Sequence, residues 1–187
     1  MRGNPEPETR GDLIPEVLVS MSSAAVQSTQ PRTIVHKFGG TSVADAERYR
    51  HVAQLLLARD EDVQVTVVSA MKGVTDALIE LCELAARSRS EWREPWHELR
   101  ARHRGAVVSL LGEDSGPTLE WLDERFDKLA EILAALAVIG ELPREVLDRV
   151  QGLGEVCSAR LLGDYLKSKG EDCAVLDARE VLVVDHS

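Results

Sequence analysis

The stretch TIVHKFGGTSVADAERYRHVAQLLLA, residues 33–58, decides the fold of this chain of 187 residues. Its first six residues are β-prone and stop at Gly39 and Gly40, and apolar residues then recur at positions 46, 49, 53, 56 and 57. The pattern predicts a strand, a glycine turn and a helix. Ser42, with Asp45 three residues later, is typical of a shortened capping box, so we expect the helix to begin just beyond the glycines.

The same order of elements follows once more. Residues 63–69 form an apolar run dense enough to predict a strand covered on both faces, and residues 73–87 have the spacing of an amphipathic helix. Two further strands are expected at 173–176 and 181–184. Alternation of strand and helix predicts an α/β fold with a parallel-rich sheet covered by helices.

Two long helices are expected between these units. Apolar stripes at helical spacing occur on both sides of the turn at residues 112–117, which predicts an antiparallel hairpin covering about residues 90–141. A further helical region runs from Pro143 to Lys169 and is interrupted by Gly152 and Gly154. Trp92 and Trp96 are expected to be core anchors of the hairpin.

Composition excludes several classes of function. The formal charge is -10, with 32 acidic against 22 basic residues, so binding of nucleic acid by a basic surface is excluded. The longest strongly apolar stretch, residues 132–139, is far short of the roughly 20 residues that cross a bilayer. The three cysteines are odd in number and lack a C-x-x-C spacing, which favours reduced, buried thiols and no metal site in a cytoplasmic protein.

Residues 1–32 are rich in Pro, Glu, Ser, Thr and Gln and show no sustained periodicity. Such a segment cannot bury enough apolar surface to offset the entropy lost on ordering, so we expect a disordered leader. Residues 33–187 then form one domain, and no helix follows the last expected strand, which is unusual for a finished doubly wound domain. We therefore expect the domain to be incomplete at its C-terminal end.

The first candidate site is the run from Lys37 to Ser42. Glycines directly after a strand let the backbone approach an anion, the following helix N-terminus adds a partial positive charge, and Lys37 adds a full one. Gly39, Gly40, Thr41 and Ser42 complete a candidate phosphate cradle that matches neither standard nucleotide fingerprint. The alternative, an ordinary Gly-Gly turn with a solvated lysine, stays open on these residues alone.

Two further segments lie at equivalent places. Ser69 and Thr75 flank a glycine loop between a strand end and a helix start, and parallel strands end at the same edge of a sheet, where open α/β sheets bind ligands. The alternative is that both hydroxyls only cap the turn and the helix. Glu155 follows Gly152 and Gly154 at another helix start, where a glutamate is most often a surface residue that complements the helix dipole.

Four segments, KFGGTSVADAERY, VVSAMKGVTDAL, GLGEVCSARLLGDYLKSKG and VLDAREV, occur in an order that resembles the aspartate kinase family within the amino-acid kinase fold. The resemblance implies transfer of phosphate from ATP, with Mg²⁺, to the side-chain carboxylate of L-aspartate, the first step of lysine, threonine and methionine biosynthesis. It implies that Lys37 and the Gly39 and Gly40 amides contact the transferred phosphoryl group. Ser69 and Thr75 would line the aspartate pocket, and Glu155 would hold the substrate ammonium group.

The resemblance also has limits. Met71-Lys72 adds a positive charge beside the site to which no role is assigned. The family continues with a second glycine-rich segment, a nucleotide-binding half and regulatory domains. This chain therefore resembles only the N-terminal, acceptor half of such an enzyme. The resemblance also implies a homo-oligomer when the enzyme is complete. The hairpin is similar to that of the longer class of the family, and we expect the class fused to homoserine dehydrogenase, although another fusion stays open.

Two alternatives to an enzyme active on aspartate stay open. The chain could be a truncated, non-catalytic fragment that only binds substrate or associates with other chains, and we expect it not to turn over ATP and aspartate alone. A different amino-acid kinase, with another acceptor, is disfavoured by the joint presence of Lys37, Thr75 and Glu155.

Overall fold

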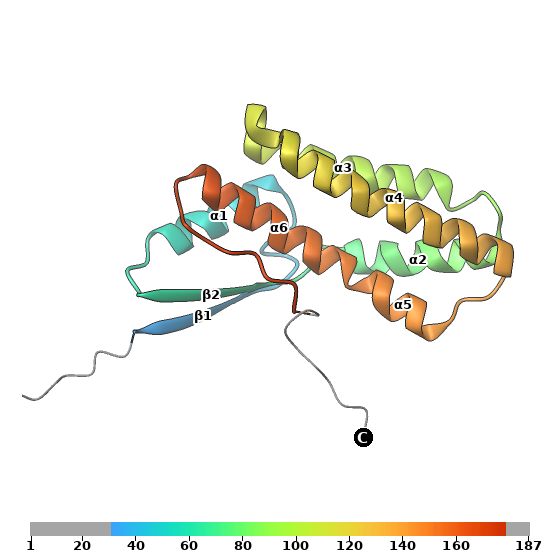
Figure 1. The fold of residues 1–187 in the computed structure, drawn as a ribbon, viewed down its shortest axis with the longest axis horizontal. Coiled ribbons are helices and arrows are strands. Elements are labelled where there is room, and N and C mark those ends of the chain that lie inside the picture. The colour runs from blue at the N-terminus through green and yellow to red at the C-terminus, as the bar shows by residue number, and fades with distance from the viewer. Residues whose placement is uncertain (1–30, 179–187) are drawn as a thin grey trace, which may run out of the picture. The chain divides into compact units, whose positions relative to one another are not determined.

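The computed structural model describes residues 31–178. Strand β1 (Thr33–Phe38) is followed by helix α1 (Ala46–Leu57) and strand β2 (Val63–Val68), and the two strands pair in parallel through this helical crossover. Figure 1 shows the two strands side by side at the lower left, with α1 next to them. The predicted strand, turn, helix and strand of the first unit are confirmed.

The sheet has one covered and one open face. In the parallel register Val35 lies opposite Val65 and Lys37 lies opposite Val67. Val35, Val65 and Val67 are 66%, 44% and 50% exposed, whereas Val68 on the other face is buried. The expectation that residues 63–69 would be covered on both faces is therefore wrong for residues 31–178, because the described helices supply apolar side chains to one face alone.

The start of α1 differs from the expected capping box. Asp45 itself is the N-cap, and its carboxylate accepts a hydrogen bond from the Arg48 amide at 2.9 Å. Ser42 lies earlier, in the turn, where its amide donates to the Gly39 carbonyl at 2.8 Å. The helix can begin only after this turn has closed, so the cap moves to the next side chain that can accept a hydrogen bond.

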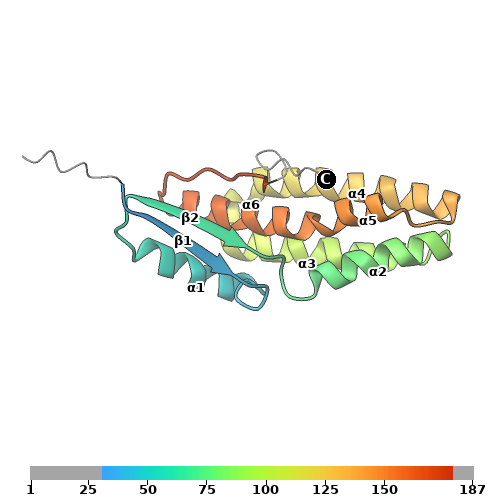
Figure 2. The ribbon, with the colours of Figure 1, turned by 90° about the horizontal axis from the view of Figure 1, so that it is seen from below.

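Helices make up most of the remaining chain. Figures 1 and 2 show them gathered beside the sheet, with the long pair α3 and α4 lying along α2 and α6. Their bounds, together with those of the short 3-10 turn η1, are α2 Val74–Arg87, α3 Arg93–Leu111, η1 Gly112–Ser115, α4 Gly116–Ile139, α5 Arg144–Gln151 and α6 Leu153–Ser168.

Helices α3 and α4 form the expected hairpin. The Trp96 indole donates to the Phe126 carbonyl at 3.1 Å, and nearer the turn Arg100 pairs with Asp123 at 3.0 Å, so the helices run antiparallel. His103 is buried beside Phe126, with ring centroids 5.2 Å apart, and its Nδ1 lies 2.8 Å from the Leu99 carbonyl. Burial lowers the pKa of His103 to about 4, because the charged ring would lose its hydration.

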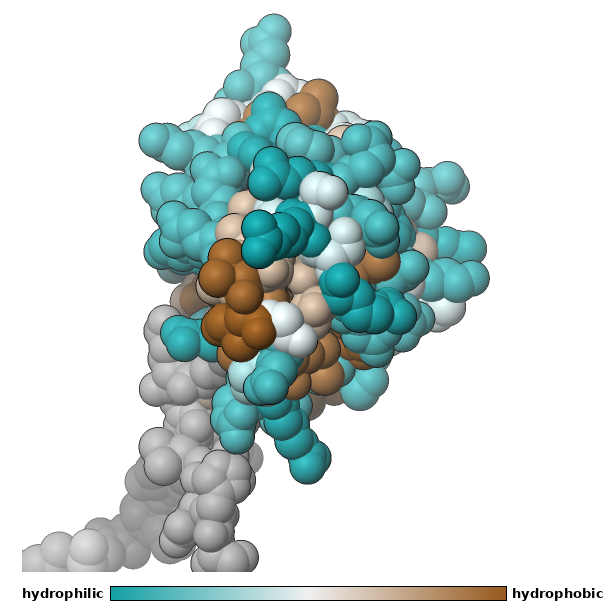
Figure 3. All heavy atoms as spheres, turned by 90° about the vertical axis from the view of Figure 1, so that its right-hand side faces the viewer, coloured by the Kyte–Doolittle hydropathy of each residue, from teal (hydrophilic) through white to brown (hydrophobic). Residues whose placement is uncertain are grey.

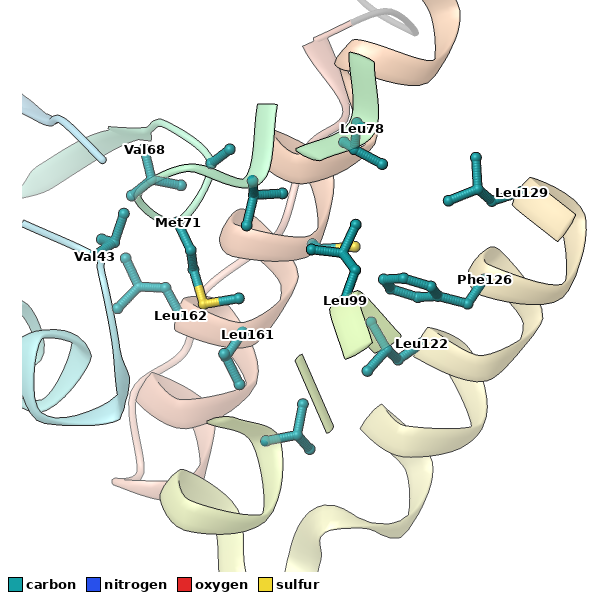
Figure 4. Packing of buried hydrophobic residues seen from close by; sticks show 14 of the residues in the cluster. Val43, Val68, Met71, Leu78, Leu99, Leu122, Phe126, Leu129, Leu161 and Leu162 are labelled. Atoms are coloured by element: carbon teal, nitrogen blue, oxygen red, sulfur yellow. The ribbon is translucent and has the colours of Figure 1, made fainter. Parts of the chain in front are cut away.

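One continuous apolar core joins the hairpin to the sheet unit. Figure 4 shows Met71, from the loop after β2, extending toward α6, while Phe126 and Leu129 of α4 face Leu99 and Leu78 across the core. A polar link crosses the same region, because the fully buried Tyr49 hydroxyl on α1 lies 2.9 Å from the Ser158 hydroxyl on α6.

The three cysteines are free thiols, as predicted from their number and spacing. Cys82 and Cys157 are buried, and burial raises their thiol pKa values to about 11 and about 12. Cys173 is only half-buried, so the expectation of burial holds for two of the three.

The segment after α6 departs from the expected topology. Residues 173–176 form no strand, and Cys173 and Val175 contact α6 instead. The half-buried Val175 lies over Gly163, where an added Cβ would come within 2.3 Å of the valine Cγ2, and the Cys173 sulfur lies 3.5 Å from the Gly163 carbonyl. The expected strand at 181–184 and the expected leader up to residue 30 lie outside the described residues.

The far end of the hairpin carries exposed hydrophobic side chains. Val138 and Ile139, at the end of α4, are 84% and 62% exposed, and Figure 3 shows hydrophobic side chains gathered on the face viewed from that side. Among residues 31–178 no helix is both long and apolar enough to span a membrane.

Candidate functional site

The loop after β1 and the loop after β2 touch through a glycine. A Cβ added to Gly40 would lie 2.9 Å from the Ala70 carbonyl oxygen and 3.6 Å from the Lys72 Cα, so a larger residue could not hold this position without moving the second loop. The Ser69 amide donates to the Phe38 carbonyl at 3.0 Å, which continues the strand pairing up to the loops. The first two candidate segments therefore lie side by side.

The start of α6 reaches the same place. A Cβ added to Gly154 would lie 2.6 Å from the Ala70 Cβ and 3.0 Å from the Val74 Cγ1, so glycine is needed for the close approach of α6 to the second loop and to α2. The structure thus brings all three sequence-predicted segments together around Ala70. Two candidate residues are direct chain neighbours of this contact, since Ser69 precedes Ala70 and Glu155 follows Gly154.

Buried side chains hold both loops to the core. Val43 from the first loop is fully buried and Met71 from the second is 2% exposed. Figure 4 shows Val43 and Met71 on the side of the core that faces Leu162 of α6. Met71, which had no assigned role, anchors the second loop, while its neighbour Lys72 is exposed.

Lys37 lies on the open face of the sheet, one residue before the end of β1. Its side chain is exposed and makes no hydrogen bond or ion pair with any residue between 31 and 178. Gly39 and Gly40 are half-buried and Thr41 is exposed. A flexible ammonium group beside two accessible glycine amides can neutralise a phosphate group that approaches from this face.

The second segment offers hydroxyls at a helix N-terminus. Helix α2 is capped by Gly73, at φ 79°, and within residues 31–178 no side chain provides a capping hydrogen bond. Thr75 lies in its first turn, and the hydroxyls of Ser69 and Thr75 are half-buried without a hydrogen bond to the described residues. The positive end of this helix and two free hydroxyls suit an anionic group such as a carboxylate.

Glu155 offers the opposite charge. It lies in the first turn of α6 and is half-buried, and one of its oxygens, Oε2, is fully buried with no hydrogen-bond partner within residues 31–178. A buried carboxylate oxygen without a donor is costly, and a ligand that brings an N–H group removes that cost. The three segments thus combine cation, hydroxyls and carboxylate, which suits an amino-acid ligand beside a phosphate.

Within residues 31–178 no group of three or more His, Cys, Asp or Glu side chains is placed to hold a metal ion. In proteins that use Mg²⁺ with a nucleotide, the ion is commonly bound through one or two carboxylates and the phosphate oxygens.

A sequence profile of the amino acid kinase family matches residues 32–186. The chain belongs to the amino acid kinase family. It is 35% identical over 151 residues to bifunctional aspartokinase/homoserine dehydrogenase 1 from the chloroplast of Arabidopsis thaliana, covering 80% of this chain and 17% of that one. It is 33% identical over 159 residues to the aspartokinase of Chlamydia trachomatis, covering 85% and 33%.

A solved structure of this amino acid kinase group is also similar. The crystal structure of Escherichia coli aspartokinase III in complex with aspartate and ADP matches with a TM-score of 0.65 and 25% identity, over 74% of this chain and 30% of the other. The resemblance to aspartate kinases seen in the motifs is thereby confirmed. The chain spans a third or less of the length of these three relatives.

Sequence reasoning missed one residue that contacts two of the segments. Arg102, on α3, donates hydrogen bonds to backbone carbonyls in both glycine loops. In the sequence it is one of several arginines on the polar side of α3, and carbonyl acceptors leave no sequence signal, so tertiary structure alone could find it.

Proposed function

We propose that this chain forms the acceptor half of an enzyme that transfers the γ-phosphoryl group of ATP to the side-chain carboxylate of L-aspartate. The observation that supports it best is the convergence of Gly40, Ala70 and Gly154. It brings the loop that follows Lys37, the loop between Ser69 and Thr75, and the start of α6 next to Glu155 to one edge of the sheet. The relatives named aspartokinase agree with this acceptor.

Each charged or polar residue of the proposed site binds a different group of the substrates. Lys37 and the Gly39 and Gly40 amides neutralise the phosphoryl group as it moves, since phosphoryl transfer depends on positioning and charge stabilisation. Ser69 and Thr75 position the acceptor carboxylate near the N-terminus of α2. Glu155 receives the substrate ammonium group on its unpaired buried oxygen. ATP with Mg²⁺ supplies the phosphoryl group.

The test compares two variants of a complete protein that carries these residues. Lys37→Ala should lower kcat by about a hundredfold or more with a smaller effect on the aspartate KM, because the charge acts mainly on the moving group. A kcat that stays normal would remove Lys37 from the site. Lys128→Ala, at an exposed position on α4, is the matched control and should leave both constants unchanged.

Glu155→Gln keeps the shape of the side chain but loses the charge. We expect the aspartate KM to rise by about tenfold to a hundredfold, since hydrogen bonds to charged groups are the stronger ones, with a smaller loss in kcat. Glu145→Gln alters an exposed acid in the first turn of α5 and serves as control. A normal aspartate KM in Glu155→Gln, or faster phosphorylation of another carboxylate than of aspartate, would contradict the proposed acceptor pocket.

A further inference from the structure

Arg102 joins the two glycine loops. Its Nη2 donates to the Ala44 carbonyl, in the loop after β1, at 3.2 Å, and to the Lys72 carbonyl, in the loop after β2, at 2.8 Å. These acceptors lie 28 residues apart in the chain, and the donor comes from a third element, α3. One guanidinium nitrogen therefore bridges the two loops whose segments the proposed function assigns to phosphate and to aspartate.

Arg102 links the two loops at a place where they are no longer paired as strands. Beyond the Ser69 to Phe38 hydrogen bond the loops are no longer paired as strands, and they meet through the close contact at Gly40. Beside Arg102 the surface is hollowed into a small cavity lined by Asp45, Met71 and Gly105. Because Arg102 itself lines this cavity, removing the guanidinium would enlarge it and leave the Ala44 and Lys72 carbonyls without this donor.

We propose that Arg102 is a positioning residue, through which the α3–α4 hairpin sets the spacing of the two loops for phosphoryl transfer. The inference rests on the proposed function. On this proposal the α3–α4 hairpin does more than pack against the core, because it also positions the two loops of the site. Arg102 does not touch substrate in this scheme, and it acts through the Ala44 and Lys72 backbones.

The first test is hydrogen exchange on the 187-residue chain and does not depend on activity. The reporters are the Ser42 amide, bonded to Gly39, and the Val74 amide, bonded to Met71, one in each loop. In Arg102→Ala both amides should exchange about threefold to tenfold faster, the loss expected for hydrogen bonds of ordinary strength. Arg102→Lys should retain part of the protection, because an ammonium group also donates.

The chain provides a matched control. Arg50 on α1 also donates to α3, to the backbone and side-chain oxygens of Ser109, but touches neither loop. Arg50→Ala removes an equal charge and a side chain that also donates two hydrogen bonds, but between α1 and α3, so it should leave the Ser42 and Val74 amides unchanged. Equal exchange in Arg102→Ala and the parent chain, or equal acceleration in Arg50→Ala, would overturn the inference and leave the proposed function untouched.

The second test measures kinetics in the complete protein. Arg102→Ala should lower kcat and raise the aspartate KM together, each by about threefold to tenfold, because one lost clamp displaces both loops. Arg50→Ala should change neither constant. Faster exchange with unchanged kinetics would overturn the role in the reaction, and the Lys37 variant then shows separately whether the proposed site stands.

Discussion

Gly154 is the position at which one added methyl group should separate the candidate segments. In Gly154→Ala the new Cβ would lie 2.6 Å from the Ala70 Cβ and 3.0 Å from the Val74 Cγ1. Ordinary carbon contacts are about 3.5–4.0 Å, so the two backbones must part by about 1 Å. The Ala70 Cβ is fixed to its backbone and cannot rotate away.

The magnitude follows from two opposing effects. Overpacking of a closely packed site costs about 1–3 kcal/mol, and alanine in place of glycine in a helix returns up to about 1 kcal/mol. Because the Ala70 Cβ cannot move aside, the upper part of the overpacking range applies, and we expect Gly154→Ala to lower the free energy of unfolding by about 1–2 kcal/mol after the gain from alanine. The measurement is urea unfolding of the 187-residue chain, monitored by circular dichroism. The parent and the variant should share the same dependence of unfolding free energy on urea concentration (the m-value).

Two further variants decide the cause. Gly105→Ala changes a helical glycine whose added Cβ would meet nothing within 4 Å, so it should be neutral or stabilising. Ala70→Gly removes the methyl group that collides with the new one, so the double variant should be more stable than the sum of the single effects by about 1 kcal/mol. If Gly154→Ala is as stable as the parent, or if the double variant is merely additive, the close approach of α6 to the second loop is refuted.

Two other outcomes follow from burial. The folded His103 pKa of about 4 lies below the unfolded value of about 6.5, so the unfolded chain binds more protons between these pH values. The free energy of unfolding should therefore fall as pH drops from about 6.5 to about 4, by at most about 3 kcal/mol. His103→Gln should flatten this part of the stability profile, and an unchanged pH dependence would contradict the buried neutral ring. Burial raises the pKa of all three thiols, most strongly for the buried Cys82 and Cys157, whereas Cys173 is only half-buried. A disulfide reagent at pH 8 should therefore modify Cys173 first and the other two only on unfolding. Rapid reaction of all three thiols in the folded chain would refute this order.

The sequence predicted local elements well and their edges less well. The run from Thr33 to Ala58 predicted strand, turn and helix because glycine punctuation and helical spacing are local signals. The cap of α1 was placed at Ser42 and is Asp45, since two acceptors lay within reach and the turn at Gly39 decided between them. The expected strand at 173–176 is absent because an extended segment becomes a strand only where a partner edge accepts it.

The candidate site shows the same division. Lys37, Ser69 and Thr75 could be named from the sequence, because glycine loops at strand and helix ends mark places where backbone groups can meet a ligand. Glu155 is named only through the resemblance of its segment to the aspartate kinase family. The unpaired buried oxygen of Glu155 had no sequence signal, since burial of one carboxylate atom depends on elements that pack around it from elsewhere in the chain.

By itself, the sequence determined the order of the elements from β1 to α6, the membership of the chain in its family and the residues that carry charge near the glycine loops. Tertiary structure alone decided that Gly40 and Gly154 meet at Ala70, that one face of the sheet is open within residues 31–178, and that Arg102 spans both loops. The physical reason is range: helical periodicity and turn chemistry act over a few residues, whereas close backbone contacts and hydrogen bonds to carbonyls join segments that the sequence keeps far apart.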